Sequence, residues 1–371
     1  GVIMMSDPPK VLLIATGGTI CSTQHPNGGL APMRGHLEKH LELYPEFSLP
    51  SMPKFDVLEW EDVFDSSLFN FSHWIKLAKN IEDNYYDYSG FVIAHGTDTM
   101  AYSASALSFM LEYLAKPVVF TGAQIPIGDI FNDAGHNLVA ALLVAANCDI
   151  PEVSICFANH LTRGNRTTKV DSWSHDAFES PNYPPLADFG VDLLVRTENV
   201  RAPPKNRFRI HTRLHTNIAV LWLVPGFNDS IIECFISDGT DKALVLACYG
   251  SGNAPVDKAP FRRVLENAAK RNTSIVIASQ CRRGATDLSL YQPGIELQKM
   301  GFISALDMTI EACVAKLSFL MGQGLRGSSL KDAMESNLRG ELSKYAPSFL
   351  KRHTYSRPLE NNSSNPNNSK L

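Results

Sequence analysis

The chain has 371 residues, more than a single hydrophobic core usually serves, so we expect two domains. Hydrophobic residues make up 44% of the chain and charged residues 19%, a composition that excludes a disordered or fibrous protein. The formal net charge of -4 leaves no excess of lysine and arginine to neutralise a phosphate backbone or an anionic bilayer. We therefore expect no nucleic-acid partner and no membrane partner.

In the first half of the chain, short β-rich apolar runs alternate with longer helical stretches, which is typical of a parallel sheet with crossover helices on its faces. The expected strands are residues 10–16, 55–61, 90–95, 117–121 and 152–157. The expected helices are residues 71–86, 98–114 and 132–146. Residues 1–197 are thus predicted to form a larger, doubly wound N-terminal α/β domain.

The second half of the chain begins with a polar, proline-rich stretch, residues 198–217, which we interpret as a linker. Strand-like runs at 218–224, 242–249 and 274–279, with helical stretches at 260–270 and 309–321, predict a smaller C-terminal α/β domain over residues 218–353. Residues 354–371 are too polar to bury a core and are predicted to be disordered.

The cysteine and histidine patterns bear on metals and compartment. Seven cysteines are scattered without a CxxC pair, which indicates reduced thiols rather than a disulfide framework or a zinc site. His36 and His40 lie four apart on an expected helix without an apparent third ligand, so a solvated helix face is the better interpretation. We expect no metal, no cofactor and, without a visible secretory signal, a cytoplasmic protein. A natural C-terminus at Ser369-Lys370-Leu371 would instead be a peroxisomal address.

Two of the expected strands end in unusual sequence. Ligands of an open parallel sheet bind where the carboxyl ends of the strands meet, so these ends are inspected first. The first strand runs into TGGT at residues 16–19, and the third into HGTDT at residues 95–99. Each alone can be a turn or a helix cap. Together they predict one pocket, which the lysine of RGNRTTK at residues 163–169 could reach.

The residue types in these loops point to nucleophilic catalysis. A threonine hydroxyl attacks only when a base takes its proton, and a lysine can be that base when desolvation lowers its pKa. Thr19 is the candidate nucleophile and Lys169 the candidate base, with Asp98 holding the amine and Thr97 relaying the proton. A solvated or salt-bridged surface lysine remains the alternative for Lys169.

The sequence also resembles a known family at these residues. TGGTI at 16–20 and HGTDTM at 95–100 look like the paired signatures of the bacterial-type asparaginases, and the likeness continues through TGAQIP at 121–126 and YGSGNAP at 249–255. It is nearest to the cytoplasmic type I branch, whose asparaginase domain also occurs in animal proteins with ankyrin repeats. The resemblance implies a larger N-terminal and a smaller C-terminal α/β domain, assembled as a homotetramer of two intimate dimers.

The resemblance implies a reaction and a set of roles. L-Asparagine would be hydrolysed to L-aspartate and ammonia through an acyl-enzyme on Thr19, with Thr97, Asp98 and Lys169 as the second cluster. Asp98 would also bind the α-ammonium of the substrate. Ser66, with its neighbours Asp65 and Ser67, would hold the α-carboxylate, and Ala123 would lie beside the scissile amide.

The chain departs from the family in the loop after Thr19, which would form a mobile lid. Many relatives carry a tyrosine there, whereas the best-aligned position here is Leu30 and the loop has no tyrosine. The role could pass to Tyr291, in a segment that relatives contribute from the neighbouring subunit, although a packed loop anchor is the alternative. Asn253, from the same neighbouring subunit, is a further candidate for substrate contact.

Two other functions remain open. The first is an amidotransferase subunit that releases ammonia for a partner acting on charged tRNA; such relatives usually carry an additional N-terminal domain, whereas TGGT begins here at Thr16, so we expect this function to be the weaker candidate. The second is a non-catalytic sensor in which asparagine binding closes the lid. The complete set Thr19, Thr97, Asp98 and Lys169 favours catalysis over sensing.

Overall fold

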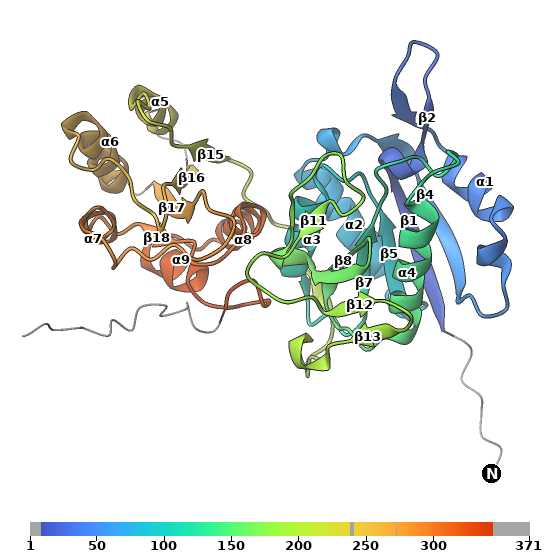
Figure 1. Cartoon of the computed structure of the whole chain (residues 1–371). Helices are drawn as coiled ribbons and strands as arrows, with labels where there is room; N and C mark the ends of the chain where they lie inside the picture. The colour runs from blue at the N-terminus through green and yellow to red at the C-terminus, as the bar shows by residue number, and fades with distance from the viewer. Residues whose placement is uncertain (1–8, 238–240, 272, 344–371) are drawn as a thin grey trace, which may run out of the picture.

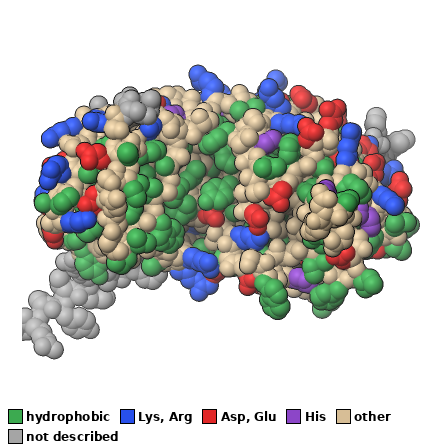
Figure 2. Space-filling view, turned by 90° about the horizontal axis from the view of Figure 1, so that it is seen from above, with side chains coloured by type: hydrophobic (Ala, Val, Ile, Leu, Met, Phe, Trp, Pro, Cys, Tyr) green, Lys and Arg blue, Asp and Glu red, His purple; other side chains and the backbone are tan. Residues whose placement is uncertain are grey.

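The computed structural model describes residues 9–237, 241–271 and 273–343, which form two α/β domains (Figure 1). The predicted disordered tail at 354–371 and the terminal Ser369-Lys370-Leu371 lie outside the described residues. Within the described ranges, none of the helices combines the length and the apolarity needed to span a membrane. Basic and acidic side chains are mixed on the face shown in Figure 2, without a large area of either sign.

The larger domain is built on an eight-stranded sheet with the strand order β13-β12-β9-β8-β7-β5-β1-β4. Its strands are β1 (Lys10–Gly17), β4 (Lys54–Phe64), β5 (Gly90–Ala94), β7 (Val118–Thr121), β8 (Val153–Phe157), β9 (His160–Arg163), β12 (Ala187–Phe189) and β13 (Leu193–Val195). The five strands expected from the sequence pair in parallel. The last three are antiparallel additions that the sequence pattern did not predict.

The central strands are apolar at consecutive positions because both faces of the sheet are covered. In β1, Leu12 and Ile14 pack into one hydrophobic cluster with α2 and α3, whereas Val11 and Leu13 pack into a second cluster with α4. A strand buried on both sides loses the alternation of polar and apolar residues seen in half-exposed strands. The helices are α1 (His36–Leu43), α2 (Phe71–Asp83), α3 (Met100–Met110) and α4 (Ala134–Asn147).

The helix predicted over residues 98–114 is shorter in the structure. It ends at Met110 because the next two residues form a short strand, β6 (Leu111–Glu112). This strand pairs antiparallel with β14 (Arg209–Ile210), which lies in the stretch interpreted as a linker. The stretch therefore makes sheet contacts with the N-terminal domain on its way to the smaller one.

The smaller domain has a four-stranded parallel sheet in the order β15-β16-β17-β18. Its elements are β15 (Ile218–Trp222), α5 (Ser230–Ile236), β16 (Ala243–Cys248), α6 (Ala259–Lys270), β17 (Ser274–Ser279), α7 (Gln292–Lys299), β18 (Ile303–Ser304), α8 (Ile310–Gly322) and α9 (Gly327–Met334). Helices α5, α6 and α7 cover one face and α8 and α9 the other. The short helices α5, α7 and α9 were not predicted.

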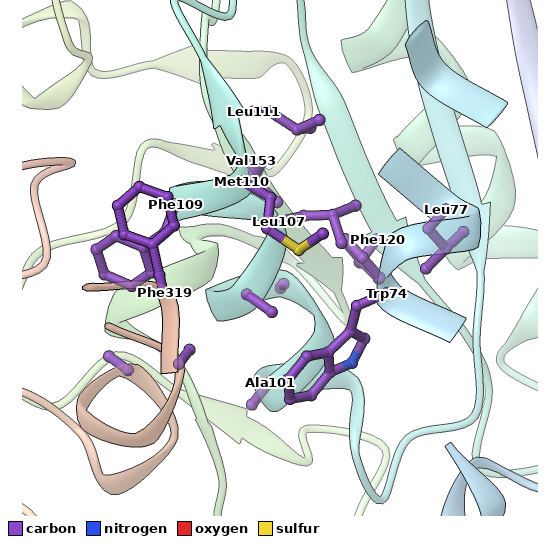
Figure 3. Close-up of a cluster of buried hydrophobic side chains, with 14 of the residues drawn as sticks. Trp74, Leu77, Ala101, Leu107, Phe109, Met110, Leu111, Phe120, Val153 and Phe319 are labelled. Carbon is purple, nitrogen blue, oxygen red and sulfur yellow. The ribbon is translucent and has the colours of Figure 1, made fainter. Parts of the chain in front are cut away.

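The two domains share one hydrophobic cluster. Helix α8 of the smaller domain packs against α3 of the larger one, and the rings of Phe319 and Phe109 stack there with centroids 6.0 Å apart (Figure 3). Polar contacts cross this seam as well: Arg166 of the larger domain forms a buried ion pair with Asp307 of the smaller one at 2.9 Å. The domains are thus joined by a continuous core and not only by the connecting chain.

Candidate active site

Three loops meet at the carboxyl ends of β1, β4 and β5, and glycines allow them to touch. A Cβ atom on Gly18 would lie 2.2 Å from the Cα atom of Gly96, and one on Gly96 would lie 2.6 Å from the Oγ atom of Ser66. Gly18 also has a φ of 80°, in the region that favours glycine. The loops predicted to share one pocket are therefore in direct backbone contact, which brings residues 19, 66 and 97 to one place.

Thr19 opens a short 3-10 turn, η1 (Thr19–Cys21), immediately after β1. The amide of Gly18 donates a 2.7 Å hydrogen bond to the carbonyl of Phe64, which fixes the turn against the end of β4. Thr19 is partly exposed, whereas its neighbours Ile20 and Cys21 are fully buried. Burial, with Glu59 nearby, raises the pKa of the Cys21 thiol to about 12, so this cysteine stays protonated and cannot compete as the nucleophile.

The second cluster is assembled around Lys169. Its Nζ atom lies 2.8 Å from the Oγ1 atom of Thr97 and 2.7 Å from the Oδ1 atom of Asp98, and it donates to both. Thr97 is only 5% exposed and its hydroxyl donates in turn to the Oε1 atom of Gln124 at 3.3 Å. The Asp98 side chain is 66% exposed, so it has surface available to a ligand while it binds the amine.

Contacts with both domains hold the segment that carries Lys169 in place. It lies in β10 (Thr168–Lys169), which pairs antiparallel with β11 (Phe178–Glu179). The preceding Arg166 is 1% exposed and reaches across the seam, where it forms an ion pair with Asp307 at 2.9 Å and donates to the carbonyl of Glu341 at 2.6 Å. The Lys169 side chain is only 17% exposed, so it is not a solvated surface lysine, although it forms an ion pair with Asp98 at 2.7 Å.

The residues expected at the substrate carboxylate lie on the loop after β4. Ser66 is 3% exposed and its carbonyl accepts a 2.8 Å hydrogen bond from the Thr99 hydroxyl, which ties it to the HGTDT loop. Asp65 and Ser67 are exposed. The Ser67 side chain and amide bind the Asp65 carboxylate and lower its pKa, so Asp65 is ionised at neutral pH.

Ala123 lies on the loop after β7 and has no exposed surface. The loop is held by Asp133, whose carboxylate accepts hydrogen bonds from the amides of Gln124 at 3.0 Å and Ile125 at 3.0 Å. Gln124 contacts Thr97 and was not selected from the sequence, although it lies inside the TGAQIP motif. Its amide side chain also donates to the carbonyl of Ser174 at 3.0 Å, so it links two loops at the site.

Tyr291 and Asn253 lie in the smaller domain. Tyr291 is 57% exposed at the start of α7, and Asn253 forms a backbone bridge with Tyr249 after β16. Neither makes a contact with Thr97, Asp98 or Lys169 among the described residues of this single chain. A role for either residue in the site of a neighbouring subunit therefore stays a proposal.

The loop expected to form a lid is a β-hairpin. Its strands are β2 (Ser22–Gln24) and β3 (Leu30–Pro32), and the hairpin projects from the larger domain (Figure 1). Leu30, the position without the family's tyrosine, is 48% exposed.

The interpretation of His36 as part of a solvated helix face is wrong, since His36 is 8% exposed. In the described ranges, no three His, Cys, Asp or Glu side chains are grouped as a metal site requires.

Two α/β domains with a cluster of threonine, lysine and aspartate at the strand ends of the larger sheet are the architecture of a two-domain amidohydrolase. Comparison with known proteins defines the family. The N-terminal asparaginase model matches residues 10–201, and the glutaminase/asparaginase C-terminal domain model matches residues 217–334. The chain belongs to the asparaginase family.

Individual relatives are similar over most of the chain. The chain is 44% identical to L-asparaginase 1 of Escherichia coli K12 over 335 residues, which cover 90% of this chain and 98% of that one. It is 40% identical to a 60 kDa lysophospholipase of Mus musculus, with 93% of this chain and 64% of that one covered. The crystal structure of L-asparaginase I from Vibrio cholerae superposes with a TM-score of 0.82 at 39% identity, covering 91% and 99% of the two chains.

Proposed function

We propose that this chain hydrolyses the side-chain amide of L-asparagine to give L-aspartate and ammonia. The observation that carries the proposal is the partly buried hydrogen bond from Lys169 to Thr97, which lies in a loop packed glycine to glycine against the turn that bears Thr19. A hydroxyl nucleophile needs a partner that removes its proton, and this arrangement offers one at the same strand ends. The family match over both domains supports the substrate.

The proposed chemistry has two halves. The Thr19 oxygen attacks the side-chain carbonyl carbon while its proton passes through Thr97 to Lys169, and backbone N–H groups such as that of Thr97 stabilise the negative oxygen that develops. The C–N bond breaks, ammonia leaves with a proton, and an ester remains on Thr19. Water then attacks this ester by the same route and releases aspartate.

Substrate orientation is proposed to depend on charge. Asp98 binds the α-ammonium, and its 66% exposed side chain leaves surface for that contact. Ser66, between Asp65 and Ser67, binds the α-carboxylate, and Ala123 lies near the scissile amide. Asp65 is ionised and would repel the α-carboxylate of the substrate. Hydroxyl and amide donors of this loop must therefore lie between the two negative groups.

A homotetramer built as a dimer of dimers would add Tyr291 and Asn253 from a neighbouring subunit to the site. Large apolar side chains exposed on two loops near Gln124 and Lys169 support an interface there: Phe131 is 77% exposed and Trp173 is 89% exposed. Light scattering coupled to size exclusion gives the mass of the assembly. Mixing inactive Thr19→Ala chains with Tyr291→Phe and Asn253→Ala double-variant chains should recover activity only if sites are shared between subunits.

The decisive experiment is ammonia release by the purified chain with saturating asparagine, and with glutamine in parallel. Turnover of asparagine supports the proposal. Calorimetric binding of asparagine without turnover would favour the sensor instead. Activity that appears only with a partner acting on charged tRNA would favour the amidotransferase subunit.

We also propose a cytoplasmic location, in keeping with seven cysteines that are all free thiols. The peroxisomal alternative depends on the last three residues. A fluorescent protein fused at the N-terminus, with and without Ser369-Lys370-Leu371, separates the two locations: import that requires these residues would contradict the cytoplasmic one.

A further inference from the structure

Three arginines, Arg163, Arg201 and Arg339, lie close together where the two domains meet. Arg163 and Arg201 line a cavity of about 670 Å³ whose opposite wall is the C-terminal segment 337–343. The same two arginines, with Arg339 and Glu152, line an adjoining void of about 10 Å³, which is the size of one water molecule. The cavity is therefore bounded by both domains and has a strongly cationic inner end.

Two of the three guanidinium groups are paired. Arg163 is bound at two nitrogens by the buried carboxylate of Glu152, and it also donates to the carbonyl of Asn199 at 2.9 Å and to that of Gly340 at 3.2 Å. Arg339 lies 3.3 Å from Glu112, which it shares with Arg209 and His211. Glu341, another buried carboxylate nearby, forms an ion pair with Lys316.

Arg201 is the exception. Its backbone amide donates to Glu152 at 2.6 Å, but no ion pair or hydrogen bond joins its guanidinium to any residue that the structure describes. Burial is the largest influence on the pKa of Arg201 and lowers it. The negative charges of Glu152 and Glu341 oppose this shift, whereas the positive charges of Arg339 and Arg163 add to it. A partly buried guanidinium that forms no hydrogen bond with the nearby carboxylates is incompletely stabilised, and an anion that binds it directly reduces this penalty.

The remaining walls suit a small polar molecule. Asn199, Asn337 and Ser343 also line the cavity, but their side chains already donate to Pro185, Leu342 and Asp307, and Leu338 and Leu342 add apolar surface. One carboxylate, that of the exposed Glu198, also lines the cavity and would repel an anion. Arg201 nevertheless favours a negative ligand, because Glu152 pairs with Arg163 and Glu112 with Arg339, and no described carboxylate is bonded to the Arg201 guanidinium.

We propose that this cavity is a binding site for a small oxyanion, a carboxylate or a phosphate, with the Arg201 guanidinium as its main contact. A planar guanidinium binds either group through two parallel hydrogen bonds, which a monatomic anion such as chloride cannot accept. Because the walls come from both domains, the bound anion stabilises the seam and raises the midpoint of thermal unfolding. The site is separate from the proposed catalytic cluster and does not depend on the proposed function.

The test is thermal unfolding and calorimetry of the full chain with inorganic phosphate and with succinate, at an ionic strength held constant with chloride. Both probes should raise the unfolding temperature of the wild type and of the control Arg207→Met, which removes an exposed arginine of the same connecting segment. Arg201→Met should bind each probe at least about tenfold more weakly. If only phosphate or only succinate raises the unfolding temperature, the result identifies which oxyanion the cavity accepts.

A second variant keeps the test decisive if Arg201→Met does not fold. Glu198→Gln changes an exposed side chain and removes the one repulsive charge on the wall, so it should bind phosphate more tightly than the wild type. Equal affinities in the wild type, Arg201→Met and Glu198→Gln would overturn the proposal, as would the absence of any effect of both probes on the wild type.

Discussion

The hydroxyl of Thr168 donates a 2.7 Å hydrogen bond to the Oε1 atom of Glu311, across the seam between the domains. Thr168 directly precedes Lys169, and Glu311 lies in the first turn of α8. The strand that carries the proposed base is therefore fastened to the smaller domain at the adjacent residue. Together with the Arg166–Asp307 ion pair, this contact explains how a two-residue strand can hold an amine against Thr97.

Glu311 should make stability depend on pH. Burial raises the pKa of its carboxyl above the ordinary value of 4.5, so between these two values the folded chain holds a proton that the unfolded chain has lost. The wild type is therefore expected to lose stability as the pH rises from about 4.5 through the raised pKa. Glu311→Gln lacks this term, so its stability relative to the wild type should increase over the same range. Denaturant unfolding from pH 4 to 8 measures the difference, and parallel profiles would contradict the assignment.

Thr19→Ala should remove activity by at least about 10³-fold, because the variant has no oxygen to attack the amide. Thr19→Ser keeps the hydroxyl and should retain measurable turnover. Initial rates of ammonia release give both values, with Thr197→Ala as an exposed threonine control. If Thr19→Ala keeps substantial activity and its circular dichroism is unchanged, Thr19 is not the nucleophile.

Two variants of Lys169 separate proton transfer from charge. Lys169→Met removes both, whereas Lys169→Arg keeps a positive charge beside Asp98 but stays protonated at working pH. If the amine accepts the proton of Thr19, both variants should lose activity to a similar extent. Activity close to that of the wild type in Lys169→Arg would show that the residue acts through its charge alone.

Gly96→Ala should disrupt the meeting of the three loops. The added Cβ atom would lie 2.6 Å from the Ser66 side chain and 3.2 Å from the Cα atom of Gly18, so at least one loop must move. We expect a loss of about 1–3 kcal/mol in the free energy of unfolding, with a much larger fall in activity. Gly190→Ala is the matched control, since its nearest neighbour would be 3.9 Å away. Normal activity in Gly96→Ala would show that the loops tolerate separation.

The buried Lys316–Glu341 pair should show strong coupling. Lys316→Met leaves the Glu341 carboxylate buried without its partner and is expected to destabilise the chain by about 3–5 kcal/mol. The double variant Lys316→Met with Glu341→Gln removes both charges and should recover part of this loss. Chemical denaturation of the two single variants and the double variant gives the coupling energy. Additive losses would indicate that the pair is not a unit.

The central strands and the main helices were predictable because their signals are local. Both faces of β1 are covered, so its residues are apolar in a continuous run. Helix α2 begins at Phe71, and its N-cap Asn70 forms a capping box with His73. The short strands β9, β12 and β13 have three or four residues each, too few for a period to stand out. Their place at the edge of the sheet is set by pairing with residues elsewhere in the chain.

The sequence by itself determined which chemistry-bearing residues the chain offers: strand ends with glycine and threonine, and a lysine in RGNRTTK. Only the tertiary structure decided which of them meet, because the contacts join residues far apart in the chain. Lys169 binds Thr97 over 72 residues, and Thr168 binds Glu311 over 143. Gln124 and Arg166 lie in the TGAQIP and RGNRTTK motifs, but the motifs do not show which residues they contact, and Glu311 carries no local pattern that separates it from an ordinary polar residue. Their roles arise from burial and from the packing of α8 on α3, which no short window of sequence contains.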